Sequence, residues 1–269
     1  MTGPIRHPAV AGRFYPGNAE TLRADIESYL TPSGQKSAAL GCVVPHAGYI
    51  YSGLVAGAVF SCLQIPSRII LMCPNHTGRG HPLAINSQGV WETPLGEVTI
   101  DSELAANLMQ RCPLLTDDTE AHRSEHAAEV ELPFLQVLRP DVKFVPIAIG
   151  TSQLEVLEAL GRAMAEVAAR EGNILIIASS DMNHYENDVV TRIKDHKAIE
   201  RILALDARGL RDVVVHGNIS MCGLGPTVAM LTASRQLGAR SARLVKYATS
   251  GDVSYDWDRV VGYAGIRVD

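Results

Sequence analysis

The stretch Asn173-Ile174-Leu175-Ile176-Ile177-Ala178 is a run of aliphatic and β-branched residues that passes directly into the polar turn Ser179-Ser180-Asp181-Met182-Asn183-His184. A near-continuous apolar run of this length is typical of a strand that is buried on both faces of a parallel sheet. Ligands of open α/β sheets bind just beyond the carboxyl ends of such strands. The stretch therefore predicts an α/β fold and places Asp181 and His184 where a ligand would bind.

Two earlier segments have the same construction. Leu40-Gly41-Cys42-Val43-Val44 runs into Pro45-His46-Ala47-Gly48-Tyr49, and Arg68-Ile69-Ile70-Leu71-Met72 is followed by Pro74-Asn75-His76. Because the carboxyl ends of parallel strands meet at one edge of a sheet, these distant segments are expected to assemble a single site.

The rest of the chain alternates between helical and strand patterns, which predicts a three-layer α/β architecture. Nothing in the composition marks a linker, so residues 1–269 are predicted to form one domain around a mostly parallel or mixed sheet. Helices are expected at 18–30, 53–63, 101–111, 126–138, 154–169, 189–205, 207–215 and 225–238. Further strands are expected at 83–85, 98–100, 143–149, 244–248 and 260–268, with a turn at 91–96.

Composition narrows the class of protein. A formal net charge of −5 argues against a nucleic-acid or anionic-membrane surface, since both need clustered Lys and Arg. No apolar stretch approaches the length of a membrane span, and the first residues lack the apolar core of a signal peptide. The five cysteines form neither a CxxC pair nor a regular spacing, so a disulfide framework is not indicated. We expect a cytoplasmic protein.

His46 and His76 are the candidate metal ligands. Alone, His46 is more simply explained as a residue that caps the following helix. His76 occupies the equivalent place after another strand, and two imidazoles are a common starting set for a transition-metal site.

Cys222 is the third candidate ligand, because it precedes an expected helix whose dipole would favour a thiolate. Asp181 and His184 would lie on one side of a helical turn after their strand, where either could bind metal or act as general acid or base. The simpler interpretation of this turn is a helix cap. His126, which follows Glu125, is a weaker candidate for the pocket.

Together these motifs resemble the Memo family, also called protein B of the AmmeMemoRadiSam system. The resemblance covers nearly the whole chain and rests on the order and spacing of several motifs. They are Ala11-Gly12-Arg13-Phe14-Tyr15-Pro16, Pro45-His46-Ala47-Gly48-Tyr49, Pro74-Asn75-His76, Glu125-His126, Glu131-Leu132-Pro133-Phe134, Ser179-Ser180-Asp181-Met182-Asn183-His184, Cys222-Gly223 and Tyr247-Ala248.

The resemblance implies a fold similar to that of class III extradiol (LigB-like) dioxygenases, which hold non-haem Fe(II) with two His and one Glu and use a further His as acid or base. Carried over by motif, His46 and His76 take the two imidazole positions and His184 takes the acid–base position. Cys222 falls where those enzymes have their carboxylate. A thiolate shifts the metal preference towards softer ions such as copper or zinc, so ring cleavage does not follow from the fold.

Three hypotheses follow. The leading one is a redox enzyme with one iron or copper ion, more expected than zinc, in which Arg13, Tyr15, Tyr49 and His126 line the substrate pocket. The second is a non-catalytic module that binds a small molecule or peptide in the same pocket. The third is a metal-dependent hydrolase. The family label also suggests radical-SAM partners, and the oligomeric state stays open.

Overall fold

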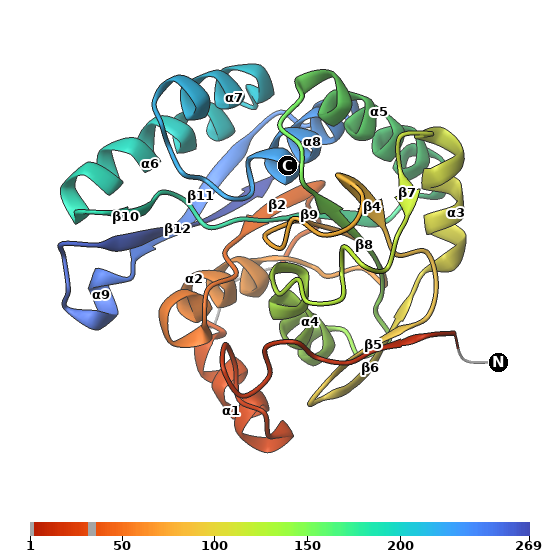
Figure 1. Ribbon diagram of the computed structural model, residues 1–269, viewed down its shortest axis with the longest axis horizontal. Coiled ribbons are helices and arrows are strands. Elements are labelled where there is room, and N and C mark those ends of the chain that lie inside the picture. Colours follow the sequence, from red (N-terminus) through yellow and green to blue (C-terminus); the bar gives the residue numbers. More distant parts are fainter. Residues whose placement is uncertain (1–2, 32–35) are drawn as a thin grey trace.

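The computed structural model describes residues 3–31 and 36–269. In that part of the chain twelve strands form one mixed sheet with helices on both faces, which confirms the predicted α/β fold (Figure 1). The strands are β1 (Ile5–Arg6), β2 (Gly41–Val44), β3 (Arg68–Pro74), β4 (Leu83–Ile85), β5 (Val90–Thr93), β6 (Gly96–Ile100), β7 (Thr116–Asp117), β8 (Lys143–Ile149), β9 (Ile174–Ser179), β10 (His184–Glu186), β11 (Ala242–Thr249) and β12 (Val260–Val268). The helices are α1 (Ala19–Tyr29), α2 (Tyr49–Cys62), α3 (Ser102–Arg111), α4 (Ala127–Leu138), α5 (Leu154–Glu171), α6 (Asp188–Leu203), α7 (Ala207–His216), α8 (Leu224–Gln236) and α9 (Gly251–Ser254).

The centre of the sheet is parallel. Its main path runs β1-β5-β6-β8-β3-β9-β2-β12-β10, and β8, β3, β9 and β2 are parallel neighbours. Antiparallel β12 lies on the other side of β2 and also pairs with β11. The three strands that precede the candidate residues are therefore consecutive, and their carboxyl ends lie at one edge.

Both faces of the central strands are buried. Along β3, Ile70 and Met72 pack into a cluster with α3, α5 and α8, while Ile69 and Leu71 pack into a second cluster with α1, α2 and α4. Each of these side chains is fully buried, which stabilises the fold by roughly 1.5–3 kcal/mol per side chain. Burial on both faces explains why these strands are continuous apolar runs rather than alternating ones.

One expected turn is a strand. Residues 91–96 were expected to form a turn, whereas β5 extends to Thr93 and pairs with β6. The turn is reduced to residues 94 and 95, and Gly96 adopts a φ of 115°, which glycine tolerates best. Trp91 is fully buried, so its side chain packs inward from an extended strand.

His184 also departs from expectation, because no helical turn follows β9. The chain instead becomes extended, and His184 begins β10, which pairs with the antiparallel strand β12. Tyr185 has a φ of 63° and reaches the surface. Pairing with a strand far away in the sequence therefore overrides the local preference of Ser179, Ser180 and Asp181 for a helix start.

None of the helices in the described residues is both long and apolar enough to cross a membrane.

Small residues let α2 approach α1 closely. A Cβ atom added to Gly57 would lie 2.3 Å from the carbonyl oxygen of Tyr29, and one added to Gly53 would lie 2.8 Å from the ring of Tyr29. Both distances are shorter than real Cβ contacts, so these glycines are needed for packing.

Gly57→Ala should lower the free energy of unfolding by about 1–3 kcal/mol, because the new methyl group meets backbone rather than a mobile side chain. Leu54→Ala is the matched control on the same helix, since Leu54 is 48% exposed and its loss should change stability by at most about 0.5 kcal/mol. Urea denaturation of both variants measures the difference. Equal stabilities would contradict the proposed contact.

Candidate metal centre

Four histidines from separate segments line one pocket at the carboxyl edge of the sheet. His46 follows β2, His76 follows β3, His126 immediately precedes α4, and His184 begins β10. The pocket has a volume of about 580 Å³. Its lining comprises Phe14, His46, Ala47, Gly48, His76, His126, Asp181, His184, Tyr185, Ser220, Cys222, Val261 and Tyr263.

Three of the imidazoles form a compact group. One ring nitrogen each of His46, His76 and His126 lies within 4.8 Å of the others. The rings of His76 and His126 stack with centroids 4.7 Å apart, and the ring of His46 meets both edge-on at 5.3 and 5.5 Å. These distances are short enough for the three residues to hold one metal ion.

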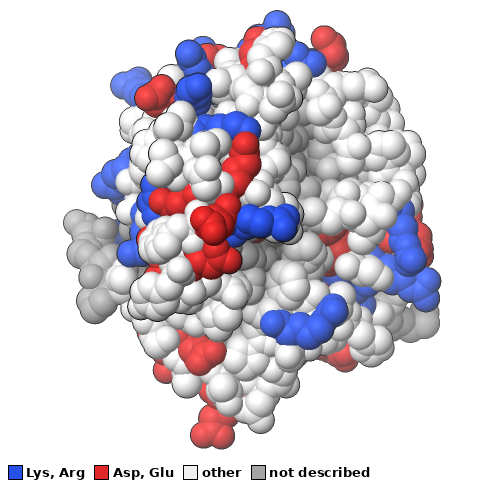
Figure 2. Space-filling model, turned by 60° about the vertical axis from the view of Figure 1, so that its left-hand side comes forward, with Lys and Arg blue, Asp and Glu red and all other residues white. Residues whose placement is uncertain are grey.

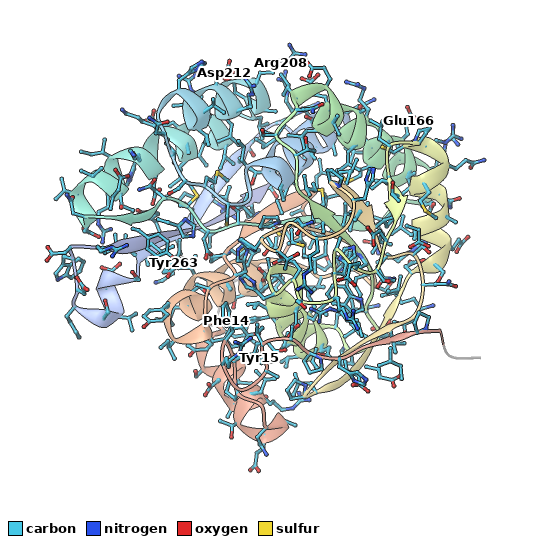
Figure 3. The ribbon with its side chains drawn as sticks, viewed as in Figure 1. Phe14, Tyr15, Glu166, Arg208, Asp212 and Tyr263 are labelled. Carbon is cyan, nitrogen blue, oxygen red and sulfur yellow. The ribbon has the colours of Figure 1, made fainter. Side chains whose placement is uncertain are left out.

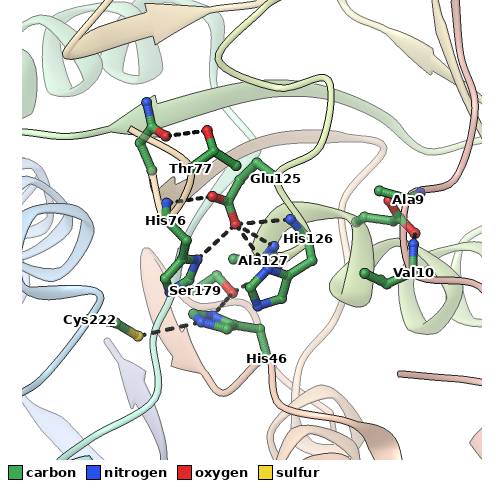
Figure 4. Close-up of polar contacts among 12 residues, drawn as sticks. Ala9, Val10, His46, His76, Thr77, Glu125, His126, Ala127, Ser179 and Cys222 are labelled. Atoms are coloured by element: carbon green, nitrogen blue, oxygen red, sulfur yellow. Dashed lines mark hydrogen bonds and ion pairs between the residues drawn. The ribbon is translucent and has the colours of Figure 1, made fainter. Parts of the chain in front are cut away.

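A single carboxylate holds two of these rings. Glu125 accepts the backbone N–H of His76 at 2.6 Å and lies 2.8 Å from its Nδ1 (Figure 4). The same carboxylate accepts the backbone N–H groups of His126 and Ala127 at 2.9 and 3.0 Å. Through these hydrogen bonds the fully buried Glu125 joins the loop after β3 to the first turn of α4.

His46 is held by the turn after β9. Its Nδ1 lies 2.8 Å from Ser179 Oγ, and its backbone N–H donates to Asp181 at 2.9 Å. The carboxyl group of Asp181 therefore anchors the loop that carries His46, which links the ends of β2 and β9.

Ser220 holds the ring of His184. The Nδ1 of His184 lies 2.9 Å from the carbonyl oxygen of Ser220, and its backbone N–H donates to Ser220 Oγ at 2.7 Å. Because a carbonyl oxygen only accepts, Nδ1 must carry the proton. Nε2 is then left with its lone pair.

The chain thus binds Nδ1 of His46, His76 and His184 and leaves the other nitrogen of each ring available. Metal-binding histidines characteristically donate their second ring N–H to a carboxylate, a carbonyl or another oxygen. Glu125, Ser179 and the carbonyl of Ser220 supply those oxygens here. The donor set therefore suits a transition-metal ion.

A family model described as Memo-like protein matches residues 6–267. The chain belongs to the Memo family. Curated relatives named MEMO1 family protein from Methanopyrus kandleri and Pyrobaculum arsenaticum are each 44% identical to it, over 97% of this chain and 98% of theirs. A relative from Methanosarcina mazei with the same name is 42% identical over 98% of this chain and 99% of its own.

These matches confirm the resemblance inferred from the Memo motifs. Among solved structures, an uncharacterized protein from Escherichia coli K12 is similar, with a TM-score of 0.54 and 13% identity over 84% of this chain and 98% of that one. At this identity the likeness shows the fold alone.

Cys222 lies beside the histidine group of this Memo protein. Its Sγ is 3.4 Å from Nε2 of His46, and the backbone N–H of Asp181 points to the sulfur at 3.3 Å. A nitrogen and a sulfur bound to one tetrahedral ion at about 2.0 and 2.3 Å lie roughly 3.5 Å apart, so the observed separation fits joint coordination. The group that could hold a metal ion comprises His46, His76 and His126. Cys222 adjoins this group through His46, and its role as third ligand stays a prediction.

Burial dominates the electrostatics of the site. It lowers the pKa of His46 well below its usual value, with the neighbouring imidazoles adding to the effect, and it lowers the pKa of His126 and His184. Burial also raises the pKa of the Cys222 thiol, which outweighs the helix start expected to favour a thiolate. Without a bound cation these groups are neutral, and their lone pairs can bind one.

Burial raises the pKa of Asp181 to about 7. The backbone N–H groups of His46 and Ala47 favour the charged form and lower the pKa, but burial has the larger effect. Asp181 therefore changes charge near neutral pH at the floor of the pocket.

The predicted pocket residues Arg13, Tyr15 and Tyr49 lie outside the pocket lining. Arg13 is exposed and donates to a backbone carbonyl, Tyr15 donates to buried Glu129, and Tyr49 donates to the carbonyl of Val130. Both tyrosines are buried. A role of these three residues in substrate binding stays a prediction. In Figure 3, Tyr15 and Phe14 lie on the N-terminal segment beside α2.

Phe14 takes the position that was expected for Tyr15. Its ring centroid is 4.8 Å from that of His126, and it lines the pocket together with Tyr263 of β12. Sequence reasoning also missed Glu125 and Ser179 as supports for the imidazoles. The adjacency of Glu125 to His126 and of Ser179 to the Asp181 turn was the available signal.

Glu125→Gln should weaken binding of a divalent metal by about 10–100-fold. An amide has one accepting oxygen, whereas the N–H groups that orient His76 and His126 use both oxygens of the carboxylate. Isothermal titration with Zn²⁺ measures the affinity. Glu120→Gln is the control, since Glu120 is half-exposed and, in the described part of the chain, its carboxylate pairs with two exposed arginines. Unchanged affinity in Glu125→Gln would show that the carboxylate does not support the site.

A second buried carboxyl group makes stability depend on pH. Asp195 accepts the backbone N–H of Asn183 at 2.8 Å and the hydroxyl of Tyr247 at 2.7 Å, behind the turn that carries His184. Burial raises its pKa from 3.8 to about 6. The folded state therefore binds a proton more tightly, and this stabilisation, complete below pH 3.8, is lost as the pH rises through about 6.

Wild-type protein should consequently lose about 2–3 kcal/mol relative to Asp195→Asn between about pH 4 and pH 7. Urea denaturation of both proteins across this range isolates the contribution of Asp195, since other groups titrate in both. Parallel pH profiles would contradict it.

Proposed function

We propose that this Memo-family protein is a metal-dependent redox enzyme that holds one iron or copper ion with His46 and His76. The observation that carries the proposal is the set of imidazoles whose Nδ1 atoms are anchored by the chain while their other nitrogens face one pocket. A third ligand comes from Cys222, which would favour copper among the two metals, or from His126. Three protein ligands leave a position open for a substrate.

A bound iron or copper ion would supply the redox change, and the side chains around it would manage protons and orientation. Nε2 of His184 carries a lone pair because Nδ1 is committed to the carbonyl of Ser220, so it can accept a proton from a substrate. Burial lowers the pKa of His184, which keeps the ring in the neutral form that accepts protons. Asp181 keeps the His46 loop in place.

The remaining walls of the pocket suit a substrate with apolar surface. Aromatic and aliphatic surface of the pocket lining comes from Phe14, Tyr185, Val261 and Tyr263. The guanidinium of Arg259 lies 5.6 Å from the ring of Tyr185 and provides a positive charge near the opening. We therefore expect a small molecule, or the end of a peptide, that combines an apolar part with an anionic group.

The three-imidazole group favours a second candidate function, zinc-dependent hydrolysis. Three histidines with an open position are a known ligand set of catalytic zinc, which activates water near neutral pH. In that case Asp181 or His184 would serve as the base. Such an activity would be insensitive to oxygen.

The metal content of two variants distinguishes a metal-binding histidine, His46, from a proton-transferring one, His184. His46→Ala should lose the metal, whereas His184→Ala should keep near-stoichiometric metal and lose turnover, because His184 is anchored by Ser220 apart from the proposed ligands. Elemental analysis of protein purified anaerobically without chelator provides the measurement. The reverse pattern would exchange the assigned roles.

The third ligand can be identified with Co²⁺ as a probe. Cys222→Ser should remove a sulfur-to-cobalt charge-transfer band and weaken binding by at least about tenfold if Cys222 coordinates. His126→Gln should produce the larger loss if His126 coordinates instead. A different outcome would favour the non-catalytic binding module. In that case the metal-free protein binds its small molecule or peptide fully, and neither variant weakens that binding.

A further inference from the structure

Two buried glutamates of α4 lie in opposite surroundings. Glu129 accepts the guanidinium of Arg6 at 2.6 Å, the hydroxyl of Tyr15 at 2.6 Å, and two backbone N–H groups at 2.7 and 3.0 Å. Its negative charge is therefore fully compensated, although the residue is inaccessible to solvent.

Glu131, two residues later, has none of this compensation. It is also inaccessible, its Oε1 lies 2.8 Å from Ser179 Oγ, and its Oε2 has no hydrogen-bond partner in the described part of the chain. Burial is the main influence on its pKa, which is raised well above the usual value. The hydrogen bond with Ser179 acts against burial, and the charge of Asp181 acts with it. An ionised Glu131 would be a buried charge without a cation, which proteins avoid by neutralising the group.

The groups that face Glu131 from other elements do not change this balance. Tyr49 of α2 and Cys42 of β2 are both buried, and burial followed by the charge of Glu131 raises the pKa of each. They are neutral at physiological pH, and Asp181 adds only negative charge. No cation among the described residues therefore offsets a carboxylate at this position.

The hydrogen bonds around Ser179 define where the proton of Glu131 lies. Ser179 Oγ contacts Nδ1 of His46 at 2.8 Å, Oε1 of Glu131 at 2.8 Å and the carbonyl oxygen of Ala127 at 3.0 Å. A hydroxyl has one proton to donate and two lone pairs. The carbonyl of Ala127 can only accept. When Ser179 donates to it, the hydroxyl oxygen can accept both from Nδ1–H of His46 and from an acid proton of Glu131, and only Oε2 of Glu131 has no partner among the described residues.

We propose that Glu131 is a positioning residue for His46: it donates a carboxylic-acid proton to Ser179 Oγ, which holds that oxygen as the acceptor for Nδ1–H of His46 and leaves the lone pair of Nε2 directed at the pocket. The imidazoles of His46 and His76 then differ in the charge of the group that accepts their Nδ1–H. Nδ1 of His76 is bound directly by the Glu125 carboxylate, whereas behind His46 stand a hydroxyl group and a neutral acid. Of the two glutamates behind these imidazoles, Glu125 adds negative charge to the site and Glu131 does not.

Infrared spectroscopy of the metal-free protein near neutral pH tests the protonation directly. The wild-type spectrum minus that of Glu131→Gln should contain the C=O stretch of a protonated carboxylic acid. Signals from Asp181 and Asp195 occur in both proteins and cancel. Absence of the band from the difference spectrum would overturn the proposal.

Stability provides the matched comparison between the two glutamates. Glu131→Gln should change the unfolding equilibrium constant by less than about tenfold, because the amide N–H replaces the acid as donor to Ser179. Glu129→Gln should raise it more than about a hundredfold, because it leaves the largely buried guanidinium of Arg6 without its counter-charge. Equal losses in the two variants would show that Glu131 is ionised and overturn the proposal.

The positioning role has its own measurements. The ¹⁵N shifts of the His46 ring in metal-free protein should report Nδ1–H in wild type and Glu131→Gln, and a changed tautomer balance in Ser179→Ala. Glu131→Ala should weaken Zn²⁺ binding about tenfold, and Glu131→Gln should restore it to within about threefold of wild type. Wild-type affinity in Glu131→Ala would overturn the role.

The Zn²⁺ measurement rests on the proposed metal function, whereas the infrared and ¹⁵N measurements do not. If wild-type protein binds no metal but retains the acid band and the Nδ1–H tautomer, the function fails and the assignment of Glu131 stands. If metal binds normally and the band is absent, the assignment fails and the function stands.

Discussion

The carboxylate of Glu125 makes the contact on which the geometry of the pocket depends. It binds the backbone and ring of His76 and the first two backbone N–H groups around the start of α4, so the position of His126 follows from that of His76. Arg6 donates to the carbonyl oxygen of Glu125 at 2.6 Å and to Glu129, which ties the N-terminal segment to the same helix. The pocket wall that carries Phe14 is fixed through this connection.

Burial determines the charge of nearly every group around the pocket. Imidazoles, a thiol and a carboxyl group that would titrate differently in water are all shifted towards their neutral forms. The exception is Glu125. Burial would raise its pKa, but the hydrogen bonds from His76 and from the backbone N–H of Ala127 outweigh burial and lower the pKa. On the face shown in Figure 2, by contrast, acidic and basic residues are interspersed and exposed to water. Counting charges in the sequence therefore says little about the charge of the site.

Much of the fold and part of the site could be predicted because they follow from local patterns. The strands 143–149 and 260–268 agree with β8 and β12 to the residue, since apolar runs that are buried on both faces have clear limits. His46, His76, His184 and Cys222 meet in one pocket because they follow strands of one parallel sheet or precede a helix beside it. Arg13, Tyr15 and Tyr49 lie outside the pocket lining because a motif does not reveal which way neighbouring side chains point.

The sequence by itself determined the Memo family, the central strands and the main helices, and most of the residues that strand ends bring together, because hydrophobic period and motif spacing are properties of the chain. The strands β1, β5, β7 and β10 were not expected. Tertiary structure alone decided which oxygen holds each imidazole, that His184 lies on a strand, and that Glu129 and Glu131 differ in charge. The physical reason is that hydrogen-bond partners and burial depend on segments more than 40 residues apart, such as Glu131 and Ser179. No local pattern encodes those contacts.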